Sequence, residues 1–316
     1  NKLPGVRAAL AHDIYTAHQM VEHDFCNVMT LGARTIGPDP AREFARAFVN
    51  AEFSGEDRHR RRLGEVIQLE REQHINPLKA LHEAGQSIWL DNIRRALLTS
   101  GTLARYISSL WVTGLTSNPT IFQHAITGSS DYDEAILKRL KRDLSTEQLF
   151  FEIALEDIIA AADLFRPVFE ATGGTDGFVS LEVSPELADD ASGTIADAKR
   201  LNTEAARPNV FIKVPGTKAG IVAIEELIFA GIPINVTLLF SREHYLAASG
   251  AYTRGLERRL EARLNLDVAS VASLFISRWD VASAPKLPEP LRNKLGIAIG
   301  QRTLKAYRDL LASQRW

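Results

Sequence analysis

A lysine lies in the middle of an apolar segment, residues 210–214, in which the other four residues are Val, Phe, Ile and Val. A charged side chain in a buried strand destabilises the fold unless it has a partner or a chemical role. A lysine in an apolar cavity has its charged form disfavoured, so it can present a free amine that attacks a carbonyl and forms a Schiff base. Lys213 is therefore a candidate nucleophile; the alternative is a structural lysine in a salt bridge.

Polar side chains also recur near the carboxyl ends of six predicted strands. Two of them are carboxylates, Asp91 and Glu182, which can shuttle protons during carbinolamine dehydration and carbon–carbon bond cleavage. No metal site is expected, because no histidine pair lies at ligand spacing on these strands. The other polar groups on the same faces are Thr116, Asn118, Asn235, Thr237 and Ser273, and Arg278 follows the last strand, where it could hold a sugar phosphate.

These residues require a parallel sheet to bring them together. Apolar runs bounded by Gly, Pro and Asn predict six strands at 87–92, 114–118, 177–183, 210–214, 234–240 and 270–277. Helical spacing predicts helices at 91–100, 130–142, 146–172, 192–205, 218–230, 241–265 and 288–313. This alternation is typical of a doubly wound sheet or a (β/α) barrel. We favour the barrel, because polar groups fall at all six strand ends and barrels build their sites there. No glycine-rich nucleotide motif follows a strand.

The first part of the chain has a different pattern, with strands expected at 5–12 and 28–31 and helices at 14–22, 39–48 and 57–73. The Asn-Pro pair at 76–77 predicts a boundary, which gives domains of 1–74 and 75–316. Arg58 and Arg62 are four apart on one helix face and could bind a phosphate; the alternative is a solvated basic face. His23 precedes a strand and is either a reactive group or a surface histidine at a helix end.

The bulk composition restricts the class of protein. Lys and Arg total 37 against 39 Asp and Glu, so no net field favours nucleic acid or an anionic membrane. No apolar run is long enough to span a bilayer. Cys26 is the single cysteine, which excludes an internal disulfide framework and suggests a reducing cytoplasm.

The segments LDNIRR, TGLTSNPTIF, GFVSLEVSP, NVFIKVPGTKAG, INVTLLFS and SLFISRWD resemble, in order, the strands of transaldolase, in particular its long mycobacterial and plant-like subfamily. The resemblance covers about residues 76–316. It implies a (β/α)8 TIM-type barrel that transfers a dihydroxyacetone unit from a ketose phosphate, such as sedoheptulose 7-phosphate or fructose 6-phosphate, to an aldose phosphate, without metal or cofactor.

The same resemblance implies a role for each candidate residue. Lys213 would form the Schiff base, Asp91 would act at the substrate C4 hydroxyl, and Glu182 would act through a water with Thr237 close by. Asn118 and Asn235 would hold the dihydroxyacetone hydroxyls, and Ser273 and Arg278 would contact the phosphate. Thr116 and Thr237 are the other two residues expected to bind substrate.

The segments GVRAALAH, EHDFCNVMTLGAR and RHRRRL resemble the second half of the ribose-5-phosphate isomerase B family, over about residues 1–70. His23 would then open the sugar ring. Arg58 and Arg62 would bind phosphate, partly across a dimer interface, which implies a homodimer through this segment. Asp24 replaces the asparagine that usually follows the histidine, and the family's Cys or Glu base and its Gly-Thr-Gly loop are absent. Isomerase activity is not expected from this chain alone.

Six strands are counted where the transaldolase barrel has eight. We therefore expect the barrel to be truncated after its sixth strand and the chain to be an internal part of an isomerase–transaldolase fusion. Two other functions stay open: a non-catalytic sugar-phosphate-binding module, and an isomerase to which the barrel is an attachment.

Overall fold

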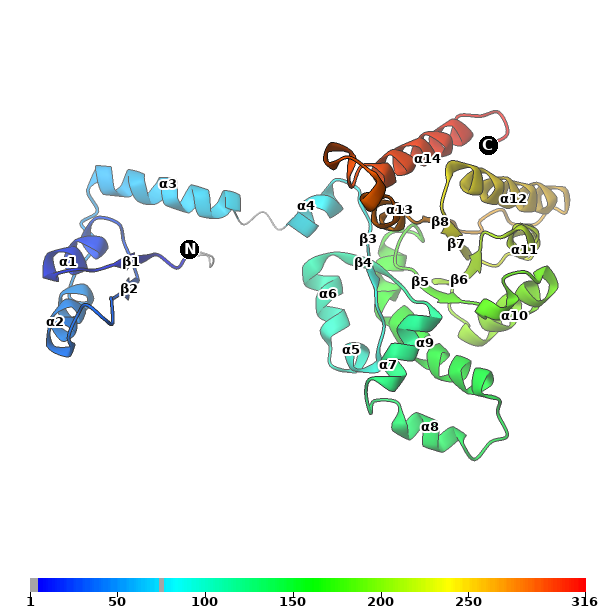
Figure 1. Ribbon diagram of the computed structural model, residues 1–316, viewed down its shortest axis with the longest axis horizontal. Coiled ribbons are helices and arrows are strands. Elements are labelled where there is room, and N and C mark those ends of the chain that lie inside the picture. Colours follow the sequence, from blue (N-terminus) through cyan, green and yellow to red (C-terminus); the bar gives the residue numbers. More distant parts are fainter. Residues whose placement is uncertain (1–4, 74–76) are drawn as a thin grey trace. The chain divides into compact units, whose positions relative to one another are not determined.

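A computed structural model describes residues 5–73 and 77–316 of the chain. The chain divides into two compact units, Asn1–Ala84 and Gly85–Trp316. The domain boundary predicted at 74/75 lies outside the described residues, so it stays a prediction. Each unit is described by itself below, and Figure 1 gives the labels of the helices and strands.

The first unit contains a two-stranded parallel sheet, β1 (Ala8–Leu10) and β2 (Val28–Thr30), joined by helix α1 (Ile14–Glu22). Helices α2 (Pro38–Val49), α3 (Asp57–Gln73) and α4 (Pro77–Glu83) follow. The Asp13 side chain starts α1 with a capping box, in which its carboxylate accepts from the Thr16 amide. A small core of Ala11, Ala17, Met20 and Phe44 forms where α1 packs on α2.

The second unit is built on a six-stranded parallel sheet with the order β3-β4-β5-β6-β7-β8, so every strand pairs with its neighbours in the sequence. The strands are β3 (Ile88–Asp91), β4 (Val112–Thr116), β5 (Val179–Glu182), β6 (Val210–Pro215), β7 (Ile234–Leu239) and β8 (Ser270–Leu274). This sequential order is that of a (β/α) barrel and not of a doubly wound sheet. The sheet curls, and within the described residues β3 and β8 each have one neighbour.

Helices surround the outside of the curved sheet (Figure 1). They are α5 (Arg95–Thr99), α6 (Thr102–Leu110), α7 (Pro119–Thr127), α8 (Asp133–Arg139), α9 (Thr146–Ala171), α10 (Ala191–Ala205), α11 (Lys218–Phe229), α12 (Arg242–Glu261), α13 (Ser277–Ser283) and α14 (Leu295–Leu311), with short 3-10 turns at Pro185–Leu187, Ala284–Lys286 and Glu289–Leu291. The main core lies between these helices and the strands and includes Leu181, Ile212 and Ile234 from β5, β6 and β7. Burial on both faces explains why the strands read as continuous apolar runs.

Two glycines permit close packing where the sheet needs it. A Cβ atom on Gly220 would lie 1.8 Å from the carbonyl oxygen of Pro215, so only glycine lets α11 start directly against the end of β6. A Cβ atom on Gly114 would lie 2.4 Å from the Trp89 ring, which fills the space inside the sheet next to β4. The ring centroids of Trp89 and Phe211 are 6.3 Å apart, and the Phe211 ring stacks on that of Phe178 with 3.9 Å between centroids. These aromatic rings form one layer of the sheet's interior.

The structure differs from the sequence prediction at several element ends. Asn118 does not lie on a strand, because β4 ends at Thr116 and Asn118 is the N-cap of α7. Its side-chain oxygen accepts from the Ile121 amide at 2.9 Å, and Pro119 takes the first helical position. Helices α6, α7 and α13 were not predicted. The last helix begins at Leu295 rather than at 288, after two short 3-10 turns.

Candidate active site

The predicted nucleophile lies on the central part of β6. Lys213 aligns with Glu182 of β5 on one side and with Asn235 of β7 on the other. The three side chains therefore form a row at one level of the sheet, on the same face. Lys213 is 7% exposed, Asn235 2% and the Glu182 side chain 17%, so the row is largely shielded from solvent. The strand register thus places an amine between a carboxylate and an amide.

The amine of Lys213 has two neighbours at hydrogen-bond distance. Its Nζ atom lies 3.1 Å from Oε2 of Glu182 and donates to the backbone carbonyl oxygen of Ser117 at 2.8 Å. The contact with Glu182 fits both interpretations of the lysine, because a structural lysine in a strand also needs such a partner. It also places a proton acceptor within one hydrogen bond of the amine, as Schiff-base chemistry requires.

The amide of Asn235 is held at both ends by serine hydroxyl groups. Its Nδ2 atom donates to Oγ of Ser180 at 3.1 Å, and its Oδ1 atom accepts from Oγ of Ser273 at 2.7 Å. Ser273, which the sequence assigned to phosphate binding, therefore touches Asn235 in this structure. The phosphate role of Ser273 stays a prediction. These two bonds fix which end of the Asn235 amide faces each strand.

Ser117 and Ser180 contact the predicted site residues, although neither was among the site residues predicted from the sequence. Both are fully buried. Ser117 lies in the turn between β4 and α7, and its Oγ atom donates to the carbonyl oxygen of Ser180 at 2.7 Å. The sequence signal was the serine next to Asn118 and Pro119, but nothing local indicated that its carbonyl would reach a lysine 96 residues away.

Two more predicted residues, Asp91 and Thr116, lie at the carboxyl ends of their strands, and Thr237 lies within β7. Asp91 is the last residue of β3, aligned with Thr116 at the end of β4, and both lie on the far side of β5 from Lys213. Thr237 is buried on β7, two residues after Asn235. The convergence of Asp91 with Lys213 and Glu182 stays a prediction.

Arg278 lies on α13, directly after β8. Its guanidinium carbon is 4.5 Å from the centre of the Phe275 ring and 6.0 Å from that of Phe240, and the residue is exposed. Two aromatic faces therefore hold a cation at the exit of the last strand, with its hydrogen-bond donors available to an anion.

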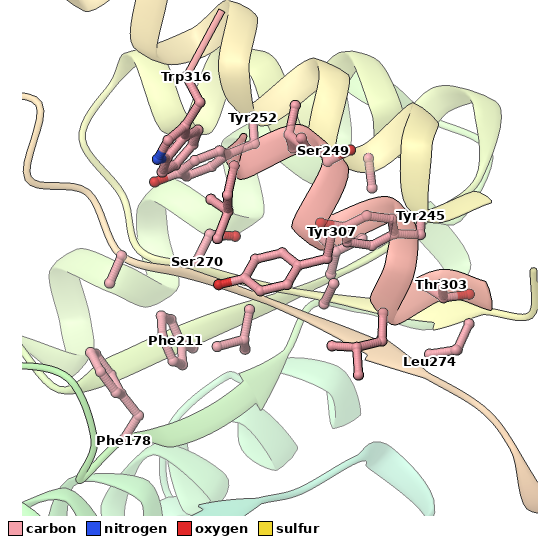
Figure 2. Close-up of a pocket in the computed structure, with 18 of the residues that line it drawn as sticks. Phe178, Phe211, Tyr245, Ser249, Tyr252, Ser270, Leu274, Thr303, Tyr307 and Trp316 are labelled. Carbon is pink, nitrogen blue, oxygen red and sulfur yellow. The ribbon is translucent and has the colours of Figure 1, made fainter. Parts of the chain in front are cut away.

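A cavity of about 870 Å³ lies beside β8, between that strand and helices α12 and α14 (Figure 2). Tyr245 and Tyr252 of α12 and Tyr307 of α14 line it, and Phe178 and Phe211 face it from the inside of the sheet. None of the predicted site residues lines this cavity. Phe211 is two residues before Lys213 on the same face of β6, so the aromatic layer separates this apolar space from the polar row.

The three remaining candidates lie in the first unit. His23 follows α1, and its ring stacks on that of His59 with 4.2 Å between centroids. Nδ1 of His59 lies 2.6 Å from Oγ of Ser54. Burial lowers the pKa of His59 below 6.5, and the neighbouring His23, Arg58 and Arg62 lower it further. His23 is thus part of a histidine pair that the sequence analysis did not foresee.

Comparison with known proteins decides the family. Residues 88–314 match the family model Transaldolase/Fructose-6-phosphate aldolase, which is more than half of the chain. The chain belongs to this family. Transaldolase 1 of Streptomyces avermitilis is 42% identical over 250 residues, which are 77% of this chain and 66% of that protein. The transaldolase of Neisseria gonorrhoeae is 46% identical over 236 residues, 74% of this chain and 65% of that protein.

The first segment matches a second family. Residues 1–66 match the model Ribose/Galactose Isomerase. The type B ribose 5-phosphate isomerase of Trypanosoma cruzi is 44% identical over 23% of this chain and 48% of that one, with a TM-score of 0.22. Both resemblances expected from the motifs are confirmed. The chain spans 65–66% of the length of the two curated transaldolases named above.

Proposed function

We propose that this chain carries the Schiff-base site of a transaldolase, which transfers a dihydroxyacetone unit between sugar phosphates. The observation that carries the proposal is the contact between Nζ of Lys213 and the carboxylate of Glu182 at 3.1 Å, inside the curved sheet of a transaldolase-family chain. A buried amine beside a carboxylate has what carbinolamine chemistry needs: a nucleophile and a group that can take and return protons.

The proposed reaction begins when the free amine of Lys213 attacks the ketose carbonyl carbon. A carbon–nitrogen bond forms, the carbonyl electron pair moves to oxygen, and one proton passes from the nitrogen to that oxygen, which gives a neutral carbinolamine. Glu182, which took a proton from the Lys213 ammonium when the free amine formed, then gives that proton to the hydroxyl, and loss of water leaves an iminium ion. Asp91 then takes the proton of the C4 hydroxyl while the C3–C4 bond breaks. An aldose phosphate leaves, and a three-carbon enamine stays on Lys213 until an acceptor aldehyde reverses these steps.

The other polar residues are proposed as binding groups. Asn235 and Asn118 would hold the hydroxyls of the dihydroxyacetone unit, with Thr116 and Thr237 close by. Arg278 would bind the phosphate, because its guanidinium is fixed by two aromatic faces at the exit of β8 and remains exposed. The substrates are therefore sugar phosphates, and the expected setting is the cytoplasm. Among the described helices, none has the length and apolar character to cross a bilayer.

Borohydride trapping tests this function. Incubation with fructose 6-phosphate and borohydride, followed by peptide mass spectrometry, is expected to find a reduced three-carbon adduct on Lys213. A three-carbon adduct from a six-carbon ketose also demonstrates carbon–carbon cleavage. Lys213→Arg should abolish the adduct, and Lys218→Arg, a change of an exposed lysine at the start of α11, should keep it. An unmodified Lys213 in a protein that still binds sugar phosphate would support the non-catalytic alternative.

A second proposal concerns the first unit, where His23 stacks on His59 close to Arg58 and Arg62. We infer that this cluster contributes part of a pentose phosphate isomerase site, with the two arginines as phosphate ligands, in a homodimer. Ribose 5-phosphate should then shift the NMR signals of His23 in the wild type and not in Arg58→Ala/Arg62→Ala. Unchanged His23 signals in the wild type would contradict it, whatever the outcome of trapping at Lys213.

A further inference from the structure

In the turn between β4 and α7, hydrogen bonds hold the residues on both sides of the Ser117–Asn118 peptide group. The register of β4 with β5 ends with Thr116 opposite Ser180. The Ser117 hydroxyl then donates to the Ser180 carbonyl oxygen at 2.7 Å, which extends the contact between the strands by one residue. On the other side, the Asn118 side chain caps α7. The Ser117 carbonyl lies between these two anchors and has little freedom to rotate.

That carbonyl points at the proposed nucleophile. Its oxygen accepts from Nζ of Lys213 at 2.8 Å, while Oε2 of Glu182 lies 3.1 Å from the same nitrogen. An amine nitrogen is tetrahedral, and one direction is taken by its bond to Cε. When a free amine donates its two hydrogens to these two acceptors, its lone pair occupies the fourth direction. Two fixed acceptors therefore determine where the lone pair points.

Resting on the proposed Schiff-base function, we propose that Ser117 is a positioning residue for Lys213. Its backbone carbonyl orients the amine, and its hydroxyl holds that carbonyl in place through Ser180. The residue touches no reacting carbon, so it acts through Lys213 alone. The orientation of a nucleophile accounts for a large part of an enzyme's rate enhancement, and a small misplacement lowers the rate by about one to two orders of magnitude.

The side-chain test compares two variants of nearly equal volume. Ser117→Thr keeps the hydroxyl and Ser117→Val removes it. The rate of borohydride-trapped adduct formation on Lys213 is measured over a range of dihydroxyacetone concentrations, a ketone that needs no phosphate site. Ser117→Val is expected to lower the limiting rate about tenfold with the half-saturating concentration unchanged, and Ser117→Thr to stay within about twofold of the wild type. The final amount of adduct per chain should be the same in all three, because the site is misaligned and not unfolded.

A matched control removes a buried hydroxyl elsewhere. Thr194 on α10 donates to the Leu187 carbonyl oxygen at 2.9 Å and is 1% exposed. Thr194→Val should trap at the wild-type rate. Equal limiting rates in Ser117→Val, Ser117→Thr and the wild type would overturn the positioning role while leaving the Schiff base intact. A lower final amount of adduct at an unchanged rate would assign Ser117 to folding only and would overturn it too. Absence of any adduct in the wild type would overturn the proposed function and this inference together.

Discussion

The carboxylate of Glu182 lies 3.1 Å from the Nζ atom of Lys213, and the strand register places the two residues directly opposite each other. The pair is largely shielded, with side-chain exposures of 17% and 8%. A carboxylate in this position can hold the amine as an ion pair and can move protons on and off the carbinolamine. The two roles respond differently to substitution.

Glu182→Gln keeps the shape and a hydrogen-bond acceptor but cannot take a proton. General acid–base catalysis contributes about 10²–10⁴-fold in rate, so we expect the rate of Schiff-base trapping to fall by a factor in that range. Glu226→Gln removes one of the two α11 carboxylates that pair with Arg258, the other being Glu225, and should leave trapping unchanged. A wild-type trapping rate in Glu182→Gln would assign the pair to structure alone.

Gly220→Ala should destabilise the second unit. The added Cβ would meet the Pro215 backbone oxygen at 1.8 Å, and backbone cannot move aside at the end of β6 without shifting the strand. Overpacking of this kind costs about 1–3 kcal/mol of unfolding free energy. Chemical denaturation followed by tryptophan fluorescence measures it, because Trp89, Trp111, Trp279 and Trp316 all lie in this unit. Gly250→Ala, whose Cβ would lie 3.5 Å from the end of the Arg254 side chain, is the control and should not destabilise.

Ala206→Gly should stabilise the same unit. Ala206 ends α10 with φ of 47° and is exposed, so it adopts the left-handed conformation that costs an L-residue about 1–2 kcal/mol. Glycine removes that strain and loses some entropy on folding, and the net gain expected is about 0.5–1 kcal/mol. Ala196→Gly, inside α10, should show the opposite sign. A lower unfolding free energy in Ala206→Gly would contradict the assigned backbone conformation.

The histidine pair predicts a pH dependence for the first unit. The fold lowers the pKa of His59 below 6.5, first through burial and then through His23, Arg58 and Arg62, while Glu56 opposes the shift. Below pH 6.5 the unfolded chain binds the proton more readily, so stability is complete above this pH and decreases as the pH falls toward the folded value. Hydrogen exchange of α1 and α3 peptides, corrected for intrinsic rates, should show this loss.

Two variants test this pH dependence, and each replaces one histidine of the first unit. His59→Gln should flatten the pH dependence. His18→Gln, a change of an exposed histidine 3.4 Å from Glu22, should retain it. An unchanged profile in His59→Gln would show that another group controls the response.

Much of the second unit could be predicted because its signals are local. Apolar runs bounded by Gly and Pro located all six strands, since strands buried on both faces leave that pattern. Lys213 was recognisable as the one charge within such a run, and Glu182 and Asn235 followed from the two-residue period of a strand. The helix α7 was missed although Asn118 and Pro119 are a cap and a first-turn proline.

The roles of Ser117, Ser180 and His59 could not be predicted from the sequence, because they depend on contacts between segments far apart in the chain. Ser117 contacts Lys213 through its backbone oxygen, and the backbone oxygen of Ser180 accepts from the Ser117 hydroxyl. A backbone oxygen is present in every residue, so the residue type does not reveal these two contacts. His59 was overlooked because the run RHRRR has the composition of a solvated charged face. Only the fold shows that this histidine turns inward against His23.

The curved sheet leaves β3 and β8 with one neighbour each within the described residues. Val271 on β8 is 37% exposed, and the apolar cavity lies beside the same strand. An edge strand with apolar neighbours is a template on which another extended chain can add. On its own, this chain is therefore expected to self-associate as its concentration rises. A segment that covered β8 would compete with that association. The highest concentration at which the chain is still monomeric therefore measures how well the β8 edge is protected.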